Sequence, residues 1–600
     1  MPSATTQAAE RLSQVQQQLA HSSPPRPDNS SRFRPALPAC LPVSYTPLNP
    51  LSFLLKAASI RPSHPALVYH HPHLDRAFEW SYSAWATRVK DLAYALLSTG
   101  LKAGDRVLVL GPNVPFVADA LQAIPAAGGT IVAVNTRLSA SEIGYIYEHS
   151  SPTVVLVDRE LVGLLPKEAV EGGDEKKVRV VQCADTYDGE DPYERFLAEG
   201  RREDERRGGK GWAGLEMQRD ENATWAISYT SGTTSRPKGV ETSYRGTYLA
   251  AIANAVESRL NDSSRYLMTL PMFHCLAWCF PYASTMAMCT QICLRTVDID
   301  EVWRGFLERG VTHYCAAPTV QIAVTSHAKA RKLDKPVLAT IAGAAPTATL
   351  IEQLEKLNIG VVHVYGLTET YGPMTRTYYV DPSSPTYYRD MARQGHAFLT
   401  ADDIRILRRS PSGEDVLNLD GTPQEVEPNG EEIGEICMRG NIVMSRYYRN
   451  EEATEEAFRN GYFHSGDLGV RYANGTFAIM DRAKDIIISG GENCSSLAVE
   501  SALAAHPDVL EVAVVARPHS KWGERPHAFV VLKPSSSAAS SPDALSAFVA
   551  VLKQFSRRTL SGFAVPEWVD VIKAEELPKT STGKVQKVAL RERVKKLPPV

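Results

Sequence analysis

Strand-like apolar runs alternate with helical stretches from Leu51 onward, and this alternation restricts the fold more than any other feature of the chain. The pattern predicts helices over residues 84–97 and 115–127 and strands over residues 106–110 and 130–134. A strand followed by a helix and a second strand places the two strands parallel in one sheet. The sequence therefore predicts an α/β fold built on parallel strands.

A loop rich in hydroxyl groups and glycine follows one of the strand-like runs. It reads Tyr229-Thr-Ser-Gly-Thr-Thr-Ser-Arg-Pro-Lys-Gly239, and its glycines let the backbone wrap closely around an anion. The pattern G-x-x-x-x-G-K-[ST] of P-loop nucleotide hydrolases is absent, because Lys238 precedes Gly239 and no hydroxyl residue follows the lysine. The loop alone is equally compatible with a surface turn that carries a lysine.

Four further motifs follow this loop in a fixed order. They are Tyr365-Gly-Leu-Thr-Glu-Thr370, then Tyr462-Phe-His-Ser-Gly-Asp467, then Asp481-Arg-Ala-Lys-Asp485 running into Ser489-Gly-Gly-Glu-Asn493, and finally Pro578-Lys-Thr-Ser-Thr-Gly-Lys584. Together with the loop, they resemble the motifs of the adenylate-forming, or AMP-binding, superfamily in its acyl-CoA synthetase and acid–CoA ligase branch. The resemblance extends over residues 47–600.

The resemblance implies an enzyme of two domains that follow an N-terminal tail. The tail spans residues 1–46, and residues 47–483 form an AMP-binding α/β domain of αβαβα-type layered sheets with a β-barrel subdomain near residues 402–446. Residues 484–600 form a small, mobile α+β domain, and Lys484 is the expected hinge between the two domains.

The implied reaction is the ATP-dependent activation of a carboxylic acid to acyl-AMP with release of pyrophosphate, followed by transfer of the acyl group to coenzyme A. The first step brings two anions together, so the site must supply positive charge. Lys584 is expected to bridge the carboxylate and the α-phosphate, and Glu369 is expected to hold Mg²⁺ through its carboxylate. Outside this motif, Glu369 would be interpreted as an ordinary exposed turn residue.

The nucleotide contacts implied by the resemblance fall into four groups. Thr230, Ser231, Gly232, Thr233, Thr234 and Lys238 are expected at the phosphates, Gly343, Ala344, Ala345, Tyr365, Gly366 and Thr368 on the adenine side, Asp467 and Arg482 at the ribose, and Gly490 and Gly491 in a loop that serves the second step. An ionised carboxylate has lone pairs for both ribose hydroxyls. Asp467 and Arg482 could alternatively be an ordinary surface ion pair.

His274 and Trp278 are the residues that the resemblance places beside the acyl group, and His274 also enters the expected catalytic set. The pattern predicts a strand over residues 266–274 that ends at His274 and an apolar helix over residues 275–288. Relatives commonly read Cys-Asn-Gly-Trp after the histidine, whereas this chain reads Cys-Leu-Ala-Trp. The apolar surroundings suit a medium-chain fatty acid or an aromatic acid.

Composition excludes several other classes of function. The formal net charge of −3 provides no basic field for nucleic acid. The sequence also contains no uninterrupted run of about 18 apolar residues, which a membrane-spanning helix would need. The nine cysteines lack the spacing of a disulfide framework, and we expect them to be reduced and mostly buried. Residues 199–221 are dense in arginine, glutamate and glycine and are expected to form a solvated surface segment.

The N-terminal tail contains the stretch Arg11-Leu-Ser-Gln-Val-Gln-Gln-Gln-Leu19, which resembles a type-2 peroxisomal targeting signal. One position, Gln16, fits that pattern poorly. A peroxisomal import receptor is the partner that such a signal would bind. The alternative is a solvated, glutamine-rich helix in a cytoplasmic protein.

Two other classes of function remain open at this stage. A stand-alone enzyme of secondary metabolism could load the acid onto a carrier protein, but amino-acid activators of the superfamily carry an aspartate near the histidine, and residues 271–281 contain none. A non-catalytic scaffold could share the fold. The presence of Lys238, Glu369, Asp467, Arg482 and Lys584 argues against the scaffold.

Overall fold

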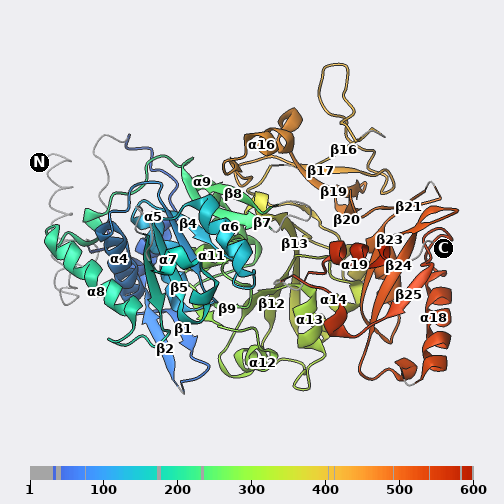
Figure 1. Cartoon of the computed structure of the whole chain (residues 1–600), viewed down its shortest axis with the longest axis horizontal. Coiled ribbons are helices and arrows are strands. Elements are labelled where there is room, and N and C mark those ends of the chain that lie inside the picture. The colour runs from blue at the N-terminus through green and yellow to red at the C-terminus, as the bar shows by residue number, and fades with distance from the viewer. Residues whose placement is uncertain are drawn as a thin grey trace, which may run out of the picture.

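The computed structural model of the chain describes residues 32–34, 42–74, 76–171, 178–230, 236–402, 404–410, 413–490, 492–539, 541–580 and 584–597 (Figure 1). The described strands form two large sheets, a four-stranded sheet and a five-stranded sheet near the C-terminus. The five-stranded sheet, coloured orange to red, lies at one end of the molecule in Figure 1.

The first large sheet contains seven strands. In spatial order they are β18 (Arg446–Tyr447), β8 (Lys238–Ser243), β7 (Thr224–Thr230), β4 (Thr130–Ala133), β3 (Arg106–Leu110), β5 (Val154–Asp158) and β6 (Arg179–Cys183). The strands from β7 to β6 are parallel, as the alternation predicts, whereas β8 and β18 are antiparallel additions at one edge. Val107 packs toward α4 (Tyr82–Ser98) and α5 (Pro115–Ala126), and the next residue, Leu108, packs toward α6 (Ala140–Ser150) on the opposite face.

The second large sheet contains nine strands. In spatial order they are β15 (His396–Ala397), β14 (Gly372–Arg376), β13 (Ile359–Leu367), β12 (Val337–Ile341), β11 (His313–Ala316), β9 (Arg265–Met268), β10 (Thr290–Cys293), β1 (Pro65–His70) and β2 (Ala77–Ser81). Its outer face packs on α12 (Ile299–Glu308), α13 (Pro318–Thr325) and α14 (Ala348–Lys356). Its inner face shares a core with α3 (Leu51–Ile60), α9 (Tyr244–Glu257) and α11 (Phe280–Met286). Helices therefore lie outside and between the two sheets, which confirms the layered α/β architecture.

Two smaller sheets complete the fold. The β-rich region expected near residues 402–446 contributes β16 (Arg405–Leu407) and β17 (Gly434–Met438), which pair with β19 (Phe463–Arg471) and β20 (Phe477–Arg482) in an antiparallel sheet. The C-terminal sheet comprises β21 (Ile487–Ser489), β22 (Glu492–Cys494), β23 (Val509–His519), β24 (Gly523–Leu532) and β25 (Trp568–Val571). One face of it packs on α17 (Ser496–Ala504) and α18 (Pro542–Ser556), and the other packs on α19 (Lys587–Lys595), as expected for a small α+β unit.

Residues 199–221 differ from the expectation of a solvated segment. The first of them complete α8 (Pro192–Arg206), which packs on α4. The contact is so close that a Cβ on Gly200 would lie 1.8 Å from the carbonyl oxygen of Asp91. Farther along, Trp212 is buried in the main core. Arg201, Arg202 and Arg206 of this helix are exposed, whereas Glu203 and Asp204 are buried, an arrangement that composition alone does not distinguish from a loop.

Two expectations from composition can be checked on the described residues. Eight cysteines are described, and all of them are free and buried, as predicted for reduced thiols. Within the ranges given above, the structure contains no helix that is both long enough and apolar enough to cross a lipid bilayer.

Candidate active site

The centre of the candidate site is Asp467, which lies in β19 directly opposite Arg482 of β20. Its side chain is buried and engages both neighbours: the hydroxyl of Tyr365 donates to Oδ2 at 2.8 Å, and Nε of Arg482 lies 3.1 Å from Oδ1. Each carboxylate oxygen can accept a further hydrogen bond, so two donors of a ligand can still be bound. This geometry suits a pair of neighbouring hydroxyl groups.

Tyr365 lies at the carboxyl-terminal part of β13, a position where α/β sheets bind ligands. Its ring contacts Phe477 edge to face at a centroid distance of 6.1 Å. Burial raises the pKa of its hydroxyl well above the ordinary value, so this group remains a proton donor to Asp467. The next residue, Gly366, admits no side chain, because a Cβ there would lie 1.8 Å from the carbonyl oxygen of Gly372.

Lys584 comes from the C-terminal unit and approaches this centre from outside the large sheets. Protein atoms crowd around its ammonium although the residue keeps contact with solvent, and this crowding, together with the charge of Arg482, lowers its pKa to about 8. The carboxylate of Asp467 acts in the opposite direction. The backbone of Lys584 is held by Thr580: the N–H of Thr580 donates to the carbonyl oxygen of Lys584 at 2.7 Å, and the N–H of Lys584 donates to Oγ1 of Thr580 at 3.1 Å.

His274 lies close enough to Lys584 for the lysine charge to affect it. Burial, followed by the positive charge of Lys584, lowers the pKa of its imidazole to about 4, so His274 is neutral at physiological pH. The charge of Lys584 therefore acts on His274 across the boundary between the C-terminal unit and the large sheets. The imidazole lies 6.0 Å from the ring of Trp278, measured between ring centroids, so both residues expected at the acyl group are together.

The cationic form of Lys584 gives the site a predicted pH dependence. This form exists below its pKa of about 8 and is lost as the pH rises through that value. Because kcat/KM reports the ionisation of the free enzyme, we expect kcat/KM for ATP to fall as the pH rises through about 8. A pH profile of pyrophosphate release measures this decline in kcat/KM. The Lys484→Ala variant retains Lys584 and should retain the decline, moved to somewhat higher pH because Lys484 contributes to the lowered pKa of Lys584. A wild-type rate that stays constant to about pH 10, near the ordinary pKa of lysine, would contradict the assignment.

Glu369 lies in the short η3 turn (Thr368–Thr370) that follows β13. The hydroxyl of Tyr447 donates to its Oε1 at 2.9 Å, and burial raises the pKa of the Glu369 carboxyl above the ordinary value. Nζ of Lys238 lies 4.7 Å above the ring of Tyr447. The two charged groups therefore flank one aromatic ring. A partly desolvated carboxylate is an oxygen ligand that Mg²⁺ accepts alongside substrate phosphates.

The strand predicted over residues 266–274 and the helix predicted over residues 275–288 are confirmed only in part, because regular helix begins at α11 (Phe280–Met286). Strand β9 ends at Met268, and residues 275–279 form a tight turn, α10 (Cys275–Trp278) followed by Cys279, in which every φ is positive, between 41° and 66°. Residues other than glycine and asparagine seldom adopt this backbone conformation. The apolar character and the spacing of residues 275–279 therefore could not predict it. The turn presses Trp278 against Gly372, where a Cβ would lie 3.0 Å from Cα of Trp278.

The remaining expected contacts are placed as follows. Thr230 ends β7 and pairs with Lys238 at the start of β8, so the two ends of the phosphate loop meet, whereas Ser231, Gly232, Thr233 and Thr234 lie outside the described residues. Thr368 receives a contact from Cys275 Sγ at 3.1 Å, and Gly343, Ala344 and Ala345 form an exposed turn after β12. Gly490 lies against Trp522, whose carbonyl oxygen accepts its N–H, and Gly491 lies outside the described residues.

Tyr447 was not identified from the sequence, although it contacts both Glu369 and Lys238. It belongs to β18, which pairs with β8, and the two strands are separated by about 200 residues of chain. Such a long-range pairing leaves no local pattern. Its place near the end of the β-rich region expected at residues 402–446 is a sequence signal that could have pointed to it.

Comparison with known proteins gives matches along most of the chain. Residues 54–448 match the family model of the AMP-binding enzyme, and residues 498–584 match that of the AMP-binding enzyme C-terminal domain. The acetate–CoA ligase CCL3 of Humulus lupulus is 37% identical over 578 residues, which cover 92% of this chain and 96% of the relative. The peroxisomal acetate/butyrate–CoA ligase AAE7 of Arabidopsis thaliana is 36% identical, with coverages of 93% and 97%.

A third relative and a solved structure extend this comparison. The peroxisomal trans-cinnamate:CoA ligase of Petunia hybrida is 35% identical over 93% of this chain and 96% of its own length. ATP-bound MatB from Rhodopseudomonas palustris superposes with a TM-score of 0.76 at 23% identity, covering 92% of this chain and all of that structure. At this identity the structural match shows a shared fold.

Proposed function

The chain belongs to the AMP-binding enzyme family in its acid–CoA ligase branch, and from this premise we propose how its site carries out the two steps of the reaction. The enzyme activates a carboxylic acid with ATP to acyl-AMP and pyrophosphate, and then transfers the acyl group to the thiol of coenzyme A with release of AMP. The names of the relatives include acetate, butyrate, cinnamate and benzoate. The proposed range of substrates, which the sequence analysis limited to medium-chain fatty acids and aromatic acids, is therefore broadened to include short-chain acids.

One observation carries the proposal for the first step: the charges of Asp467 and Arg482, which form an ion pair, act on the pKa of Lys584, and the charge of Lys584 acts on that of His274, although these residues come from separate parts of the chain. Attack of a carboxylate on the α-phosphate concentrates negative charge, and a nearby ammonium stabilises it. Lys584 is the ammonium of this centre. Neutral His274 adds no competing charge beside the acid, and it borders the acyl group together with Trp278.

The nucleotide is proposed to lie along the carboxyl ends of β12 and β13. Asp467 accepts hydrogen bonds from the ribose hydroxyls, with Tyr365 and Arg482 holding its carboxylate, and the turn of Gly343, Ala344 and Ala345 together with Gly366 and Thr368 borders the adenine side. Lys238 and the loop from Thr230 bind the phosphates. Glu369 is the proposed Mg²⁺ ligand, and the ion would neutralise the departing pyrophosphate.

Isotope exchange between pyrophosphate and ATP tests the first step. The wild-type enzyme, supplied with Mg²⁺ and a panel of acetate, butyrate, hexanoate, benzoate and cinnamate, should exchange label only when a suitable acid is present. Omission of coenzyme A isolates adenylation from transfer. Exchange that is absent with every acid, or that proceeds equally without an acid, would contradict the proposal.

We further propose that Lys484 is the hinge about which the C-terminal residues turn between the two steps. Positive side chains crowd this boundary: partial burial, Arg482 and Arg591 lower the pKa of Lys484 to about 8, and Lys484 in turn contributes to the lowered pKa of Lys584. The phosphates of ATP would relieve this repulsion, and the departure of pyrophosphate would restore it. The orientation that the C-terminal residues adopt in the structure is thus suited to adenylation.

Import into peroxisomes is proposed for this chain, because several relatives are named peroxisomal and residues 11–19 resemble a targeting signal that lies outside the described residues. Deletion of Met1–Ala20 should leave acid-dependent pyrophosphate exchange unchanged but move a fluorescently tagged protein from peroxisomes to the cytosol. Microscopy of both forms in the same cells measures this. Substitution of Gln17 alone serves as a control and should not alter the distribution. Unchanged punctate fluorescence after the deletion would rule out the signal.

A further inference from the structure

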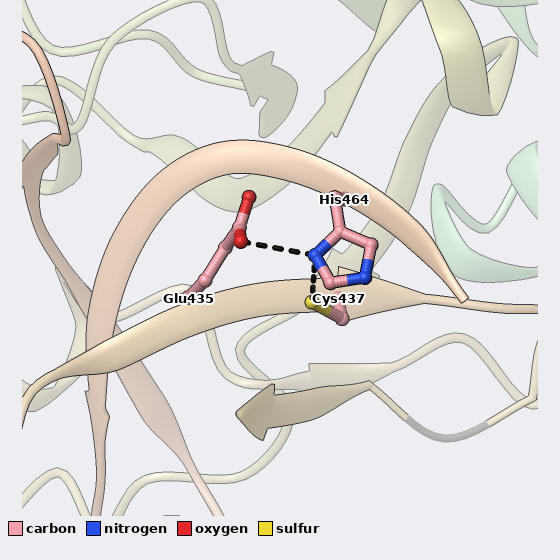
Figure 2. Close-up of side chains that lie close together, drawn as sticks. All are labelled: Glu435, Cys437 and His464. Atoms are coloured by element: carbon pink, nitrogen blue, oxygen red, sulfur yellow. Dashed lines mark hydrogen bonds and ion pairs between the residues drawn. The ribbon is translucent and has the colours of Figure 1, made fainter. Parts of the chain in front are cut away.

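A buried cluster of polar side chains lies directly behind the Ser465–Asp467 turn. Glu435 and Cys437 of β17 face His464 of the neighbouring β19 (Figure 2). Nδ1 of His464 lies 2.9 Å from Oε2 of Glu435 and 3.3 Å from Sγ of Cys437. All three side chains are buried, and the sequence analysis did not single out Glu435 or Cys437.

A carboxylate, an imidazole and a thiol are a ligand set that zinc accepts, so the charge of the cluster must be examined. Arg459 Nη2 lies 3.0 Å from Oε2 of Glu435, and Arg409 also pairs with this carboxylate. The buried carboxylate of Asp415 lies 3.5 Å from Arg409 and 3.5 Å from His464. Two guanidinium groups therefore balance two carboxylates.

The two remaining members of the cluster contribute no net charge. Burial lowers the pKa of His464 to about 4 and raises that of the Cys437 thiol, so both are neutral at physiological pH. The two arginines thus supply the positive charge that a bound cation would otherwise supply, and ion pairs balance the charge of the cluster. Its role must then lie in what Glu435 holds.

Glu435 has a second oxygen, and this oxygen points to the turn that carries Asp467. Oε1 accepts the N–H of Gly466 at 2.9 Å. The same turn is held on its other side by Ser465, whose Oγ donates to the carbonyl oxygen of Ile436 at 2.6 Å and accepts the N–H of Asp467 at 3.0 Å. Glu435 and Ser465 therefore attach the turn to β17 at two adjacent points.

We propose that Glu435 is a positioning residue, which fixes the Ser465–Asp467 turn so that the carboxylate of Asp467 meets the ribose hydroxyls of ATP. The inference rests on the proposed function, in which Asp467 binds the ribose. The carboxylate of Asp467 must satisfy Tyr365, Arg482 and two ligand hydroxyls at once, and displacements of about 1 Å are enough to weaken such an arrangement severely. The arginines hold Glu435 in place for this task.

The test compares how strongly the enzyme distinguishes AMP from 2′,3′-dideoxy-AMP, which lacks both ribose hydroxyls. In the Glu435→Asp variant the carboxylate and its charge remain, but the side chain is one methylene too short to reach Gly466 and the arginines together. Calorimetry should show AMP binding weakened about tenfold, the loss expected for a hydrogen bond to a charged group, with binding of dideoxy-AMP nearly unchanged. The KM for ATP should rise, and the KM for the acid should stay constant.

Glu432→Asp is the matched control. Glu432 precedes the same strand and pairs with Arg408, whose Nη2 lies 2.9 Å from Oε2 and whose Nε lies 2.5 Å from Oε1. Its Oε2 also accepts the N–H of Glu427 at 2.8 Å, but Glu432 does not contact the Ser465–Asp467 turn. The control should bind both nucleotides like the wild type. If Glu435→Asp does not fold, Glu435→Gln, which keeps the length but loses the charge, takes its place with the same expectation.

The outcomes separate the proposal from its alternatives. A variant that loses both nucleotides equally shows a general structural role and overturns the proposal, as does a variant that loses neither. Stoichiometric zinc in the purified wild-type enzyme, whose removal by a chelator weakens AMP binding, would assign the cluster to a metal instead. Since nucleotide binding needs no acid, the measurement decides the role of Glu435 even if pyrophosphate exchange fails for every acid in the panel.

Discussion

Replacing Lys584 with alanine should abolish the formation of acyl-adenylate while leaving the conversion of supplied acyl-adenylate to the CoA thioester largely intact. Lys584 is the ammonium that lies among Asp467, Arg482 and His274, where the carboxylate and the α-phosphate are proposed to meet. Removal of one group that stabilises the developing charge costs roughly 10²–10³-fold in rate. In the thioester step the thiol attacks the acyl carbon and AMP departs as an anion, but the proposed rotation about Lys484 moves Lys584 away before this step, so its rate should change far less.

The two half-reactions can be measured separately. Pyrophosphate release without coenzyme A reports adenylation, and thioester formation from synthetic acyl-AMP reports transfer. Lys579→Ala is the control, because Lys579 lies in the same segment but pairs with Glu511 at 2.6 Å. It should retain both rates. Normal adenylation by Lys584→Ala, or equal losses in both steps, would contradict the assignment.

The layered architecture follows from patterns that are local in the sequence. Apolar runs such as residues 106–110 can be buried on both faces only as central strands of a parallel sheet, and β3 is central. The motif residues Tyr365 and Asp467 were identified because the short motifs that contain them resemble those of the AMP-binding superfamily. The structure places both residues at one centre, joined by a hydrogen bond.

What the sequence did not reveal depends on contacts between distant segments or on backbone conformation. Tyr447 reaches Glu369 only through the pairing of β18 with β8, and Glu435 reaches Gly466 only through the pairing of β17 with β19. The left-handed turn after His274 contains ordinary side chains, so its conformation is imposed by the surrounding packing. Residue type alone predicts neither the long-range strand pairing nor the left-handed backbone conformation.

Lys484→Pro should preserve adenylation but slow transfer of the acyl group to coenzyme A by about tenfold or more, if rotation about this position limits the second step. Several contacts hold the segment around Lys484 in its present orientation. The N–H of Asp485 donates to the carbonyl oxygen of Arg482 at 2.8 Å, that of Ala483 donates to Gly466 at 3.0 Å, and Arg591 pairs with Asp485. Rotation between steps must break contacts of this kind and concentrate the change in φ and ψ within a few residues.

A proline at position 484 fixes φ near −65° and therefore restricts the rotation, whereas alanine at the same position removes only the charged side chain. Lys484→Ala is accordingly the matched control and should carry out both half-reactions. Single-turnover rates of pyrophosphate release and of thioester formation from acyl-AMP, together with a thermal unfolding curve for each variant, separate a blocked rotation from a damaged fold. Equal losses in both half-reactions for Lys484→Pro, or a transfer defect of the same size in Lys484→Ala, would show that the side chain or the stability of this segment matters and that it is not the hinge.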